Sequence, residues 1–485
     1  MRPTIRFLDE QLITRILDEA RELLRTLGMT ILNQEVLSLL GDHGAEVDLS
    51  AEHVRFNDEI IDKALKTSPS SFQLFDVLGN QTHDFSGDNV HYTPGSAAIN
   101  VLDHATGEAR RPATADYIRY AKLVGGLKHI AAQSTAFVPD DVAEPLSDSY
   151  RLFLSLLFCE KPVVTGAFSK NFDVISDLQL IVRGSAEELK QKPLTVISVC
   201  PTAPLKWTAA ASQNLLDCAR HSIPVEYISM PLPGFMAPVT VVGSLIQHTA
   251  ETLSGIVISQ LANPGTPMLY GGAPGIFDMR FETTPMGAIE TMMIDCAYVE
   301  IGKFLNIPTQ TYTAMSDAKL LDAQAGLETG MGAALGALAG VNNISGPGIL
   351  DFINTFSLEK LVVDNEICGM TFRLLEGIQP RDDFPASPLF QEFLRDKHLI
   401  IADHTRKHLR EEIHFPGPTI DRANRARWQQ NGALTIGEQA SKEVERLILE
   451  AEPTRLDEGV QSQLIERMEK AARSAGMEAL PQRDR

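Results

Sequence analysis

Cysteine is scarce in this sequence, and no two cysteines lie close together. The five thiols are Cys159, Cys200, Cys218, Cys296 and Cys368. An odd number without a Cys-x-x-Cys spacing argues against both a disulfide framework and a cysteine metal site. We therefore expect reduced thiols, most of them buried.

Positive charge and long apolar stretches are lacking as well. The chain has 43 Lys and Arg against 63 Asp and Glu, a formal net charge of −20, which would repel nucleic acid and anionic lipid. The opening residues, MRPTIRFLDEQLITR, lack the unbroken apolar core of a signal peptide, and the most apolar stretches elsewhere are interrupted by Glu, Asn or His. We expect a cytoplasmic protein that binds neither nucleic acid nor membrane.

Motifs for a bound metal or a phosphate are also missing. His404 and His408 are four residues apart, with His398 and His414 nearby, but no Glu lies between them in the His-Glu-x-x-His order. The glycine-rich run at 330–340 lacks the Gly-Lys-Ser/Thr ending of a phosphate loop. We expect no bound metal, and we interpret the glycine run as a helix of small residues that packs closely on its neighbours.

What the sequence does contain is a rhythm of eight short apolar runs separated by helix-length amphipathic stretches. The runs do not alternate cleanly, as in LTVISV and PVEYIS, which is typical of parallel strands buried on both faces. They are Ala131–Phe137, Pro162–Ala167, Leu194–Val199, Pro224–Ser229, Pro267–Gly272, Pro308–Thr313, Asn342–Gly346 and Leu361–Asp364. We predict an α/β fold, a (β/α)₈ TIM barrel, with its reactive groups in the loops that follow the strands.

The length of 485 residues exceeds the need of a minimal barrel and predicts additions at both ends. We expect an N-terminal helical cap over residues 1–88, a hairpin and connecting helix over 89–130, the barrel over 131–380 and a C-terminal helical extension over 381–485. The turn at Asp103–Gly107, flanked by alternating polar and apolar residues, predicts the hairpin.

The loops after the predicted strands contain few acid or base side chains and several aromatic ones. Aromatic rings have negative faces that attract a cation, and several rings around one pocket can hold a quaternary ammonium group. Each ring taken alone would more often belong to the core. We expect a pocket at the strand ends lined by several of Phe168, Tyr270, Phe277, Gln310, Tyr312 and Phe356.

Five blocks of the sequence resemble a known family. The blocks are HYTPGSAAINVLD at 91–103, MLYGGAPGIFDMR at 268–280, the stretch from SDAK to GPGILD at 316–351, LVVDNEICGM at 361–370 and HTRKHLREEIHFPGPTIDR at 404–422. Together they resemble the trimethylamine methyltransferase family, the corrinoid-dependent barrel methyltransferases. The resemblance implies transfer of a methyl group from a methylated amine to Co(I) of a cobalamin carried by a separate corrinoid protein. Four glycines of these blocks are candidates for contact with that cofactor: Gly271, Gly272, Gly346 and Gly348.

One departure from the family bears on the substrate. Members that act on trimethylamine contain pyrrolysine in the barrel, whereas this chain has ordinary residues throughout the corresponding glycine-rich region. A quaternary amine already carries its positive charge, so the tertiary amine can leave as a neutral molecule without a general acid. Alignment of the reactants is then the main task of the protein. We expect demethylation of a quaternary amine, with glycine betaine favoured over proline betaine or carnitine.

A betaine also needs an anchor for its carboxylate. The candidates are Arg280, Gln310, and the backbone at 271–275 or, with Ser345, at 345–348. Arg280 could instead pair with Asp278 or Glu282. Glu226 within the fourth run could face the cation, as could Asp317 and Glu366, although carboxylates in such positions are more often in salt bridges or helix caps.

Two other interpretations stay open. A barrel lyase or aldolase could use Lys206 or Lys319 as a Schiff-base lysine, although both adjoin predicted helix starts and have the character of surface groups. The chain could also be a docking partner of a corrinoid protein that lacks transfer activity. We further expect a homo-oligomer.

Overall fold

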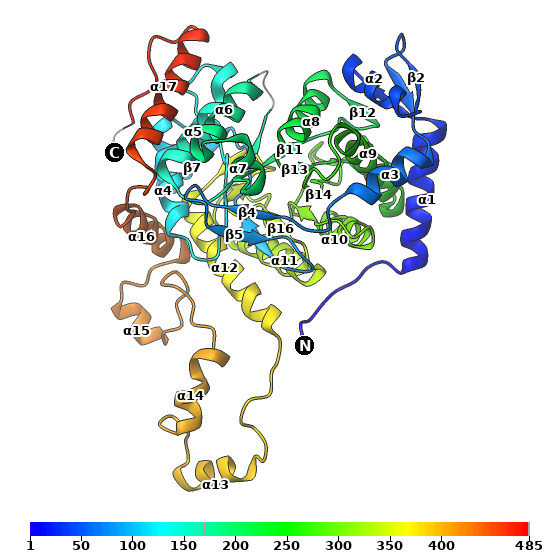
Figure 1. Cartoon of the computed structure of the whole chain (residues 1–485). Coiled ribbons are helices and arrows are strands. Elements are labelled where there is room, and N and C mark those ends of the chain that lie inside the picture. Colours follow the sequence, from blue (N-terminus) through cyan, green and yellow to red (C-terminus); the bar gives the residue numbers. More distant parts are fainter. Residues whose placement is uncertain (168–170, 484–485) are drawn as a thin grey trace.

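The computed structural model describes residues 1–167 and 171–483. Figure 1 shows a broad body in which short strands are surrounded by helices, and a helical arm that projects from one side of the body. The strands set the direction of the side chains in the interior.

Parallel strands occupy the centre of the body. In the described part of the chain they are β6 (His91–Thr93), β9 (Gln133–Ser134), β10 (Val163–Gly166), β11 (Thr195–Val199), β13 (Val225–Tyr227), β14 (Met268–Leu269), β15 (Gln310–Thr311) and β16 (Asn343–Ser345). Hydrogen bonding orders them as β9-β10-β11-β13-β14 and as β15-β16-β6. A parallel bridge between Tyr270 and Thr309 links β14 to β15. The backbone N–H of Ala131 donates to the backbone carbonyl oxygen of Tyr92 (2.9 Å), which joins β6 to β9.

Seven of the eight predicted runs contain one of these strands, but the last prediction is wrong. Leu361–Asp364 lies inside helix α12 (Leu358–Glu376), whose N-cap Ser357 accepts the N–H of Lys360. A short apolar run that is buried on all sides looks the same in a helix and in a strand. The remaining parallel strand is β6, which was expected to belong to the hairpin segment.

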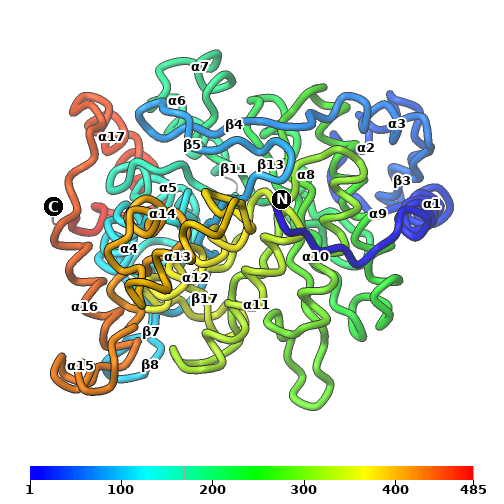
Figure 2. The backbone as a smooth tube through the Cα atoms, turned by 90° about the horizontal axis from the view of Figure 1, so that it is seen from below, coloured from blue at the N-terminus to red at the C-terminus, as the bar shows by residue number. Residues whose placement is uncertain are grey.

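Helices cover the strands. Between the strands lie η1 (Glu144–Leu146), α5 (Ser147–Phe158), α6 (Phe172–Arg183), α7 (Ala186–Gln191), α8 (Ala209–His221), α9 (Val241–Ala262), α10 (Ile289–Phe304) and α11 (Ala323–Ala339), with α4 (Thr114–Gly126) ahead of β9. Figure 2 shows the same helices from below. Helix α9 is buried along nearly its whole length because α8, α10 and the N-terminal helices pack around it. The glycine run predicted as a helix of small residues is part of α11, where a Cβ on Gly332 would lie 1.8 Å from the Thr313 oxygen.

The N-terminal segment contains strands as well as the expected helices. Its elements are α1 (Glu10–Thr26), β1 (Met29–Ile31), α2 (Gln34–Asp42), β2 (Glu46–Asp48), β3 (His53–Arg55), α3 (Asp58–Thr67), β4 (Gln73–Phe75) and β5 (Gln81–Asp84). β1 pairs with β3 and with β12 (Lys206–Trp207). Leu74 and Phe85, at the β4–β5 hairpin, pack against Val164, Val196 and Leu269 in the interior of the parallel strands. This apolar layer fills the interior on the amino side of the cavity described below.

The predicted hairpin around the Asp103–Gly107 turn is confirmed. β7 (Asn100–Asp103) pairs antiparallel with β8 (Glu108–Arg110), and β7 also pairs with β18 (Thr355–Phe356), which pairs with β17 (Ile349–Leu350). This small sheet lies beside the carboxyl ends of β6 and β9, where a parallel bridge joins Ala98 and Phe137.

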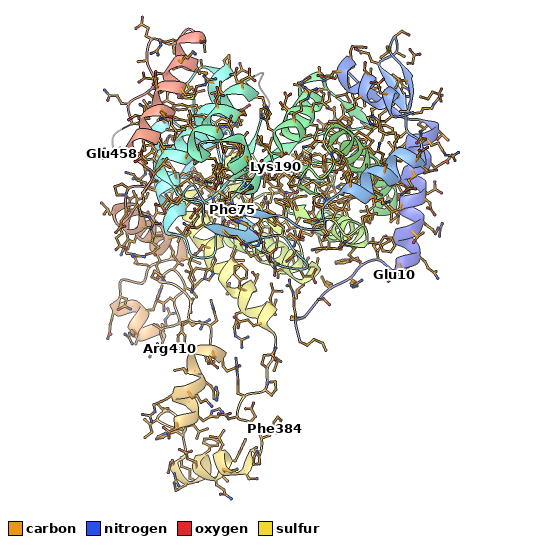
Figure 3. The ribbon with its side chains drawn as sticks, in the orientation of Figure 1. Glu10, Phe75, Lys190, Phe384, Arg410 and Glu458 are labelled. Carbon is orange, nitrogen blue, oxygen red and sulfur yellow. The ribbon has the colours of Figure 1, made fainter. Side chains whose placement is uncertain are left out.

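The C-terminal segment is helical, as predicted. It comprises α13 (Ser387–Asp396), α14 (Asp403–Glu412), α15 (Arg425–Gln430), α16 (Ile436–Leu449) and α17 (Glu458–Ser474). α13 and α14 form the projecting arm, which includes the exposed Phe384 (Figure 3). α16 and α17 return to the body and bury Val444, Leu464 and Met468. None of the helices in the described ranges is long and apolar enough to cross a bilayer.

Candidate functional site

A cavity of about 250 Å³ lies at the carboxyl ends of the parallel strands. Its lining residues share one property, because most of them come from the last positions of a parallel strand or from the loop that follows it. They are Ser96, Ala97, Thr135, Arg151, Gly166, Ser198, Cys200, Ile228, Met230, Ala273, Tyr312 and Ile353. Carboxyl ends of parallel strands are where α/β folds of this kind hold their ligands. The cavity is therefore the candidate site.

Strand alternation decides which side chains reach the cavity. Ser198 and Cys200 both line it, as do Ile228 and Met230, since residues two apart share a face. Residues of the opposite phase on these strands point outward. Tyr227 donates its hydroxyl to Ser259 of α9 (2.8 Å), and the Tyr270 hydroxyl donates to Thr249 of the same helix (3.2 Å).

Glu226 lies next to the cavity, behind Ser198. The Ser198 hydroxyl donates to Glu226 Oε1 (2.6 Å), and the Asn343 amide donates to Glu226 Oε2 (3.3 Å). Burial disfavours the carboxylate and raises the pKa of Glu226 to about 7, although both hydrogen bonds oppose this shift. A carboxyl group with this pKa can carry a negative charge near neutral pH when a cation is close to it.

Tyr312 supplies an aromatic ring to the cavity wall. Its side chain is 7% exposed, and its hydroxyl lies 2.9 Å from Ser96 Oγ. Burial, followed by the charge of Glu226, raises the pKa of Tyr312 above its ordinary value, so the phenol is neutral. The ring can offer its negative face to a cation without carrying a charge of its own.

Arg151 brings a buried positive charge to the same cavity from helix α5. Its side chain is 2% exposed. Nη1 donates to the backbone carbonyl oxygen of Thr135 (2.9 Å), Nη2 to Asp148 Oδ1 (2.5 Å) and Nε to the backbone carbonyl oxygen of Ser147 (3.2 Å). These bonds fix the plane of the guanidinium.

Two further polar side chains lie in the interior next to the cavity residues. Gln310 Oε1 accepts the N–H of Gly272 (3.2 Å), while Gln310 Nε2 and Ser345 Oγ have no hydrogen-bond partner among the described residues. Both side chains are buried. Unsatisfied buried groups of this kind are costly and are commonly retained for a ligand or an ordered water.

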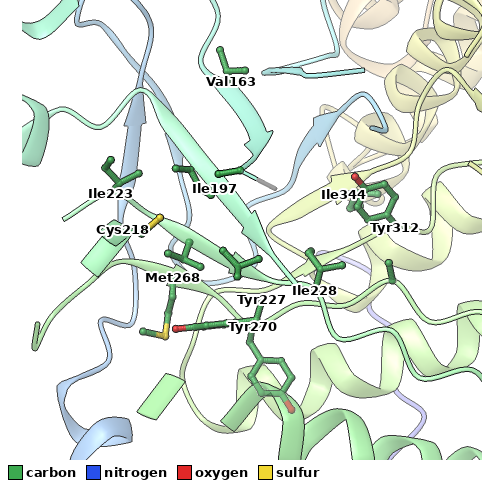
Figure 4. Close-up of a cluster of buried hydrophobic side chains, with 14 of the residues drawn as sticks. Val163, Ile197, Cys218, Ile223, Tyr227, Ile228, Met268, Tyr270, Tyr312 and Ile344 are labelled. Atoms are coloured by element: carbon green, nitrogen blue, oxygen red, sulfur yellow. The ribbon is translucent and has the colours of Figure 1, made fainter. Parts of the chain in front are cut away.

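The structure moves most of the predicted aromatic residues away from the cavity. Tyr227, Tyr270 and Tyr312 belong to one buried apolar cluster (Figure 4), but the Tyr270 hydroxyl is directed to Thr249 of α9 and Tyr270 does not line the cavity. Phe356 is buried against Tyr120 and Phe137, with ring centroids 5.3 and 5.6 Å away. Phe277 stacks on Phe235 (4.9 Å) in the loop after β14. Phe168 lies outside the described residues. The expected group of several rings is therefore absent from the described lining, and Tyr312 alone remains.

Arg280 also lies outside the cavity. Its side chain is 79% exposed and pairs with Asp278 (2.6 Å), which is the alternative considered from the sequence. Among the other carboxylates, Asp317 accepts the N–H groups of Met286 and Gly287, and Glu366 accepts the N–H of Gly417. Arg280, Asp317 and Glu366 are all absent from the described lining of the cavity.

The four candidate glycines are buried and serve close packing. A Cβ on Gly271 would lie 2.4 Å from Gln310 Oε1, and one on Gly272 would lie 2.6 Å from His248 Nε2. Gly346 and Gly348 have φ angles of +129° and +89°, a region that favours glycine, and the N–H of Gly348 donates to Asp364 (2.7 Å). These contacts do not offer a surface for a large cofactor.

Neither candidate Schiff-base lysine lines the cavity. Lys206 lies on β12, which pairs with β1. The Lys319 side chain is 60% exposed, and its Nζ lies 3.9 Å from the centroid of the Phe352 ring. In the described part of the chain no three His, Cys, Asp or Glu side chains are grouped closely enough to hold a metal ion. All five cysteines are free thiols.

The sequence interpretation missed Arg151 and Ser198. Arg151 interrupts the apolar stretch SDSYRLFLSLLF three residues after Asp148, and such a charge pair inside an apolar helix was the available signal. Ser198 gave no signal, because the phase of a strand buried on both faces cannot be derived from its residues.

Comparison with known proteins gives a consistent result. Residues 1–476 match the family model described as Trimethylamine methyltransferase (MTTB). Trimethylamine methyltransferase MttB of Methanosarcina thermophila is 30% identical over 437 residues, covering 87% of this chain and 88% of that protein. Glycine betaine methyltransferase of Desulfitobacterium hafniense (strain Y51) is 26% identical over 465 residues, covering 95% and 96%. The crystal structure of the Methanosarcina barkeri monomethylamine methyltransferase (MtmB) matches with a TM-score of 0.53 at 13% identity, covering 97% of this chain and 88% of that chain, which shows a likeness of fold.

Proposed function

The chain belongs to the trimethylamine methyltransferase family and is a methyltransferase, and we propose that its methyl donor is a quaternary amine, with glycine betaine favoured. We propose as methyl acceptor the Co(I) centre of a cobalamin that a partner corrinoid protein carries. The acceptor supplies a nucleophile for the N-methyl carbon, and the electron pair of the broken C–N bond leaves with a neutral tertiary amine.

The observation that carries this proposal is the pairing of Tyr312 and Glu226 at one small cavity. A neutral ring lines the wall, and a carboxyl group with a pKa of about 7 lies behind Ser198. Both groups favour a permanent cation. No described lining residue is placed to donate a proton to a leaving amine as a carboxylic acid or imidazole would. A quaternary amine needs no such proton, so binding and alignment are sufficient.

We also propose that the parallel strands close into a (β/α)₈ barrel with β6 as the eighth strand. Supporting this are the Tyr270 to Thr309 bridge, the hydrogen bond from Ala131 to Tyr92 and the bridge from Ala98 to Phe137. Closure would surround the cavity with eight strand ends and exclude water from the cation.

The test is a methyl-transfer assay with the full chain and Co(I) cobalamin as acceptor. Glycine betaine, proline betaine, carnitine, choline and trimethylamine are compared as donors, and methylated cobalamin is followed by its absorbance. We expect turnover of glycine betaine and none of trimethylamine. Turnover of trimethylamine alone would overturn the proposal, whereas turnover of carnitine or proline betaine alone would keep the quaternary amine and change the substrate.

A Schiff-base lyase is the alternative with a direct control. Treatment with borohydride in the presence of a carbonyl substrate labels an enzyme that forms a Schiff base. We expect no label on Lys206 or Lys319, since both lie outside the cavity lining.

A further inference from the structure

Arg151 is the one formally charged side chain among the described residues that line the cavity. It is 2% exposed. A guanidinium is strongly disfavoured away from water unless acceptors satisfy it, so a buried arginine at a ligand-sized cavity requires a reason.

The protein provides hydrogen-bond acceptors for three of the guanidinium N–H donors. Ser147, Thr135 and Asp148 accept one hydrogen bond each, from Nε, Nη1 and Nη2. A guanidinium has five N–H donors, so two remain beyond these three bonds. The three bonds hold the planar fork in place, and a fixed fork suits the two oxygens of a carboxylate.

The groups that favour a cation, Tyr312 in the cavity wall and Glu226 behind Ser198, lie on or directly after strands other than β9. Arg151 is held at Thr135, which directly follows β9. Glu226 is on β13, three strands further along the order β9-β10-β11-β13. Tyr312 follows β15, which pairs with β16, and β16 pairs with β6. The hydrogen bond from Ala131 to Tyr92 joins β6 to β9, so β15 is three strands from β9 in this direction. The positive charge and the cation-binding groups are thus separated across the cavity.

We propose that Arg151 anchors the carboxylate of a zwitterionic quaternary amine, while its ammonium group lies toward Tyr312 and Glu226. This inference rests on the proposed function and specifies its substrate class. A ligand that is only a cation gains nothing from the N–H donors of Arg151. A ligand with a carboxylate close to the ammonium group complements both sides of the cavity.

The volume of the cavity favours a short zwitterion. About 250 Å³ is below the ~300–1,000 Å³ typical of pockets for drug-sized ligands. A betaine with one carbon between nitrogen and carboxylate needs less room than one with a longer chain.

The first test changes the ligand and leaves the protein intact. Titration calorimetry on the full chain compares glycine betaine with its methyl ester, which keeps the quaternary nitrogen and loses the negative charge, and with tetramethylammonium. We expect glycine betaine to bind at least about 10-fold more tightly than the ester, the usual size of a lost charge-assisted hydrogen bond. Equal affinity for the two would overturn the anchor. Absence of binding and of methyl transfer with all three would overturn the proposed function and the anchor with it.

The second test changes the arginine. Arg151→Gln should lower the affinity for glycine betaine about 10- to 100-fold and leave that for tetramethylammonium unchanged or higher. Arg151→Lys keeps the charge without the planar fork and should fall between the two. Arg280→Gln, at the exposed arginine, is the matched control and should bind like the unaltered protein.

Two results would contradict the anchor in this series. One is an equal loss of affinity for glycine betaine and tetramethylammonium in folded Arg151→Gln, because a structural role would affect both. The other is a selective loss in Arg280→Gln. Thermal unfolding of each variant checks folding, and if Arg151→Gln does not fold, Arg151→Lys and the ester comparison decide.

Discussion

The Ser198 hydroxyl lines the cavity and donates a 2.6 Å hydrogen bond to Glu226, which is fully buried behind it. The two residues are register partners on β11 and β13, so both side chains point to the interior. Ser198 thereby connects the cavity to a buried carboxyl group with a raised pKa.

The first prediction concerns stability against pH. The pKa of Glu226 is raised from 4.5 to about 7, so between these values the folded chain binds more protons than the unfolded chain. The contribution of Glu226 to the free energy of unfolding should therefore fall as pH rises from about 4.5 to 7, with about 3 kcal/mol as its upper size. Denaturant unfolding at pH 5, 6, 7 and 8 measures it. In Glu226→Gln the decline should be smaller by that amount, and an unchanged slope would contradict the assignment.

The second concerns ligand binding against pH. A quaternary ammonium near Glu226 stabilises the carboxylate and lowers its pKa, so binding near pH 7 should release a proton. Affinity for glycine betaine should rise by up to about 10-fold from pH 6 to pH 8. Calorimetry in buffers of different ionisation enthalpy counts the released protons. In Glu226→Gln neither the rise nor the proton release should remain, and their persistence would assign them to another group.

The third prediction separates the ring of Tyr312 from its hydroxyl. Tyr312→Ala removes the ring and should weaken binding of tetramethylammonium by about 1–2 kcal/mol, the size of a desolvated cation–π contact. Tyr312→Phe keeps the ring and loses only the contact with Ser96, so it should retain most of the affinity. The dissociation constants of both variants check this. Equal losses would show that the hydroxyl, not the ring face, supports the ligand.

The contrast between Tyr270 and Tyr312 shows what the sequence could and could not predict. Both rings follow short buried strands, and the rhythm of the runs correctly located seven parallel strands. The direction of each ring was not predictable, because strands buried on both faces do not alternate and carry no record of their phase. Tyr312 shares a face with Gln310 in the interior, whereas Tyr270 is one residue out of phase with Leu269 and contacts α9.

The missed strand and the missed arginine have a common physical cause. β6 has three residues, and pairing with β16 rather than its own composition makes it a parallel strand. Arg151 is brought to the cavity by tertiary packing of α5 against β10. β6 depends on a partner strand more than 100 residues away, and Arg151 depends on a neighbouring element. Local sequence patterns do not contain such partners.

The last prediction concerns a buried ion pair that holds the loop after β16. Lys360 and Asp364 are one turn apart on α12, 0% and 1% exposed, with Nζ 2.5 Å from Oδ2. The same Oδ2 accepts the N–H of Gly348, and Lys360 also donates to Thr329 (2.9 Å). Lys360→Met would leave the buried carboxylate without its cation, and we expect a loss of about 3–5 kcal/mol in the free energy of unfolding.

An exposed pair with the same spacing provides the control for this loss. Lys192 and Glu188 are also four residues apart, at 2.7 Å, but their side chains are 42% and 39% exposed. Solvent screens such a pair, so Lys192→Met should cost less than about 1 kcal/mol. Urea unfolding of both variants beside the unaltered chain measures the difference. Similar losses in the two variants would show that burial does not set the strength of the Lys360 pair, because the two pairs share spacing and chemistry and differ mainly in exposure.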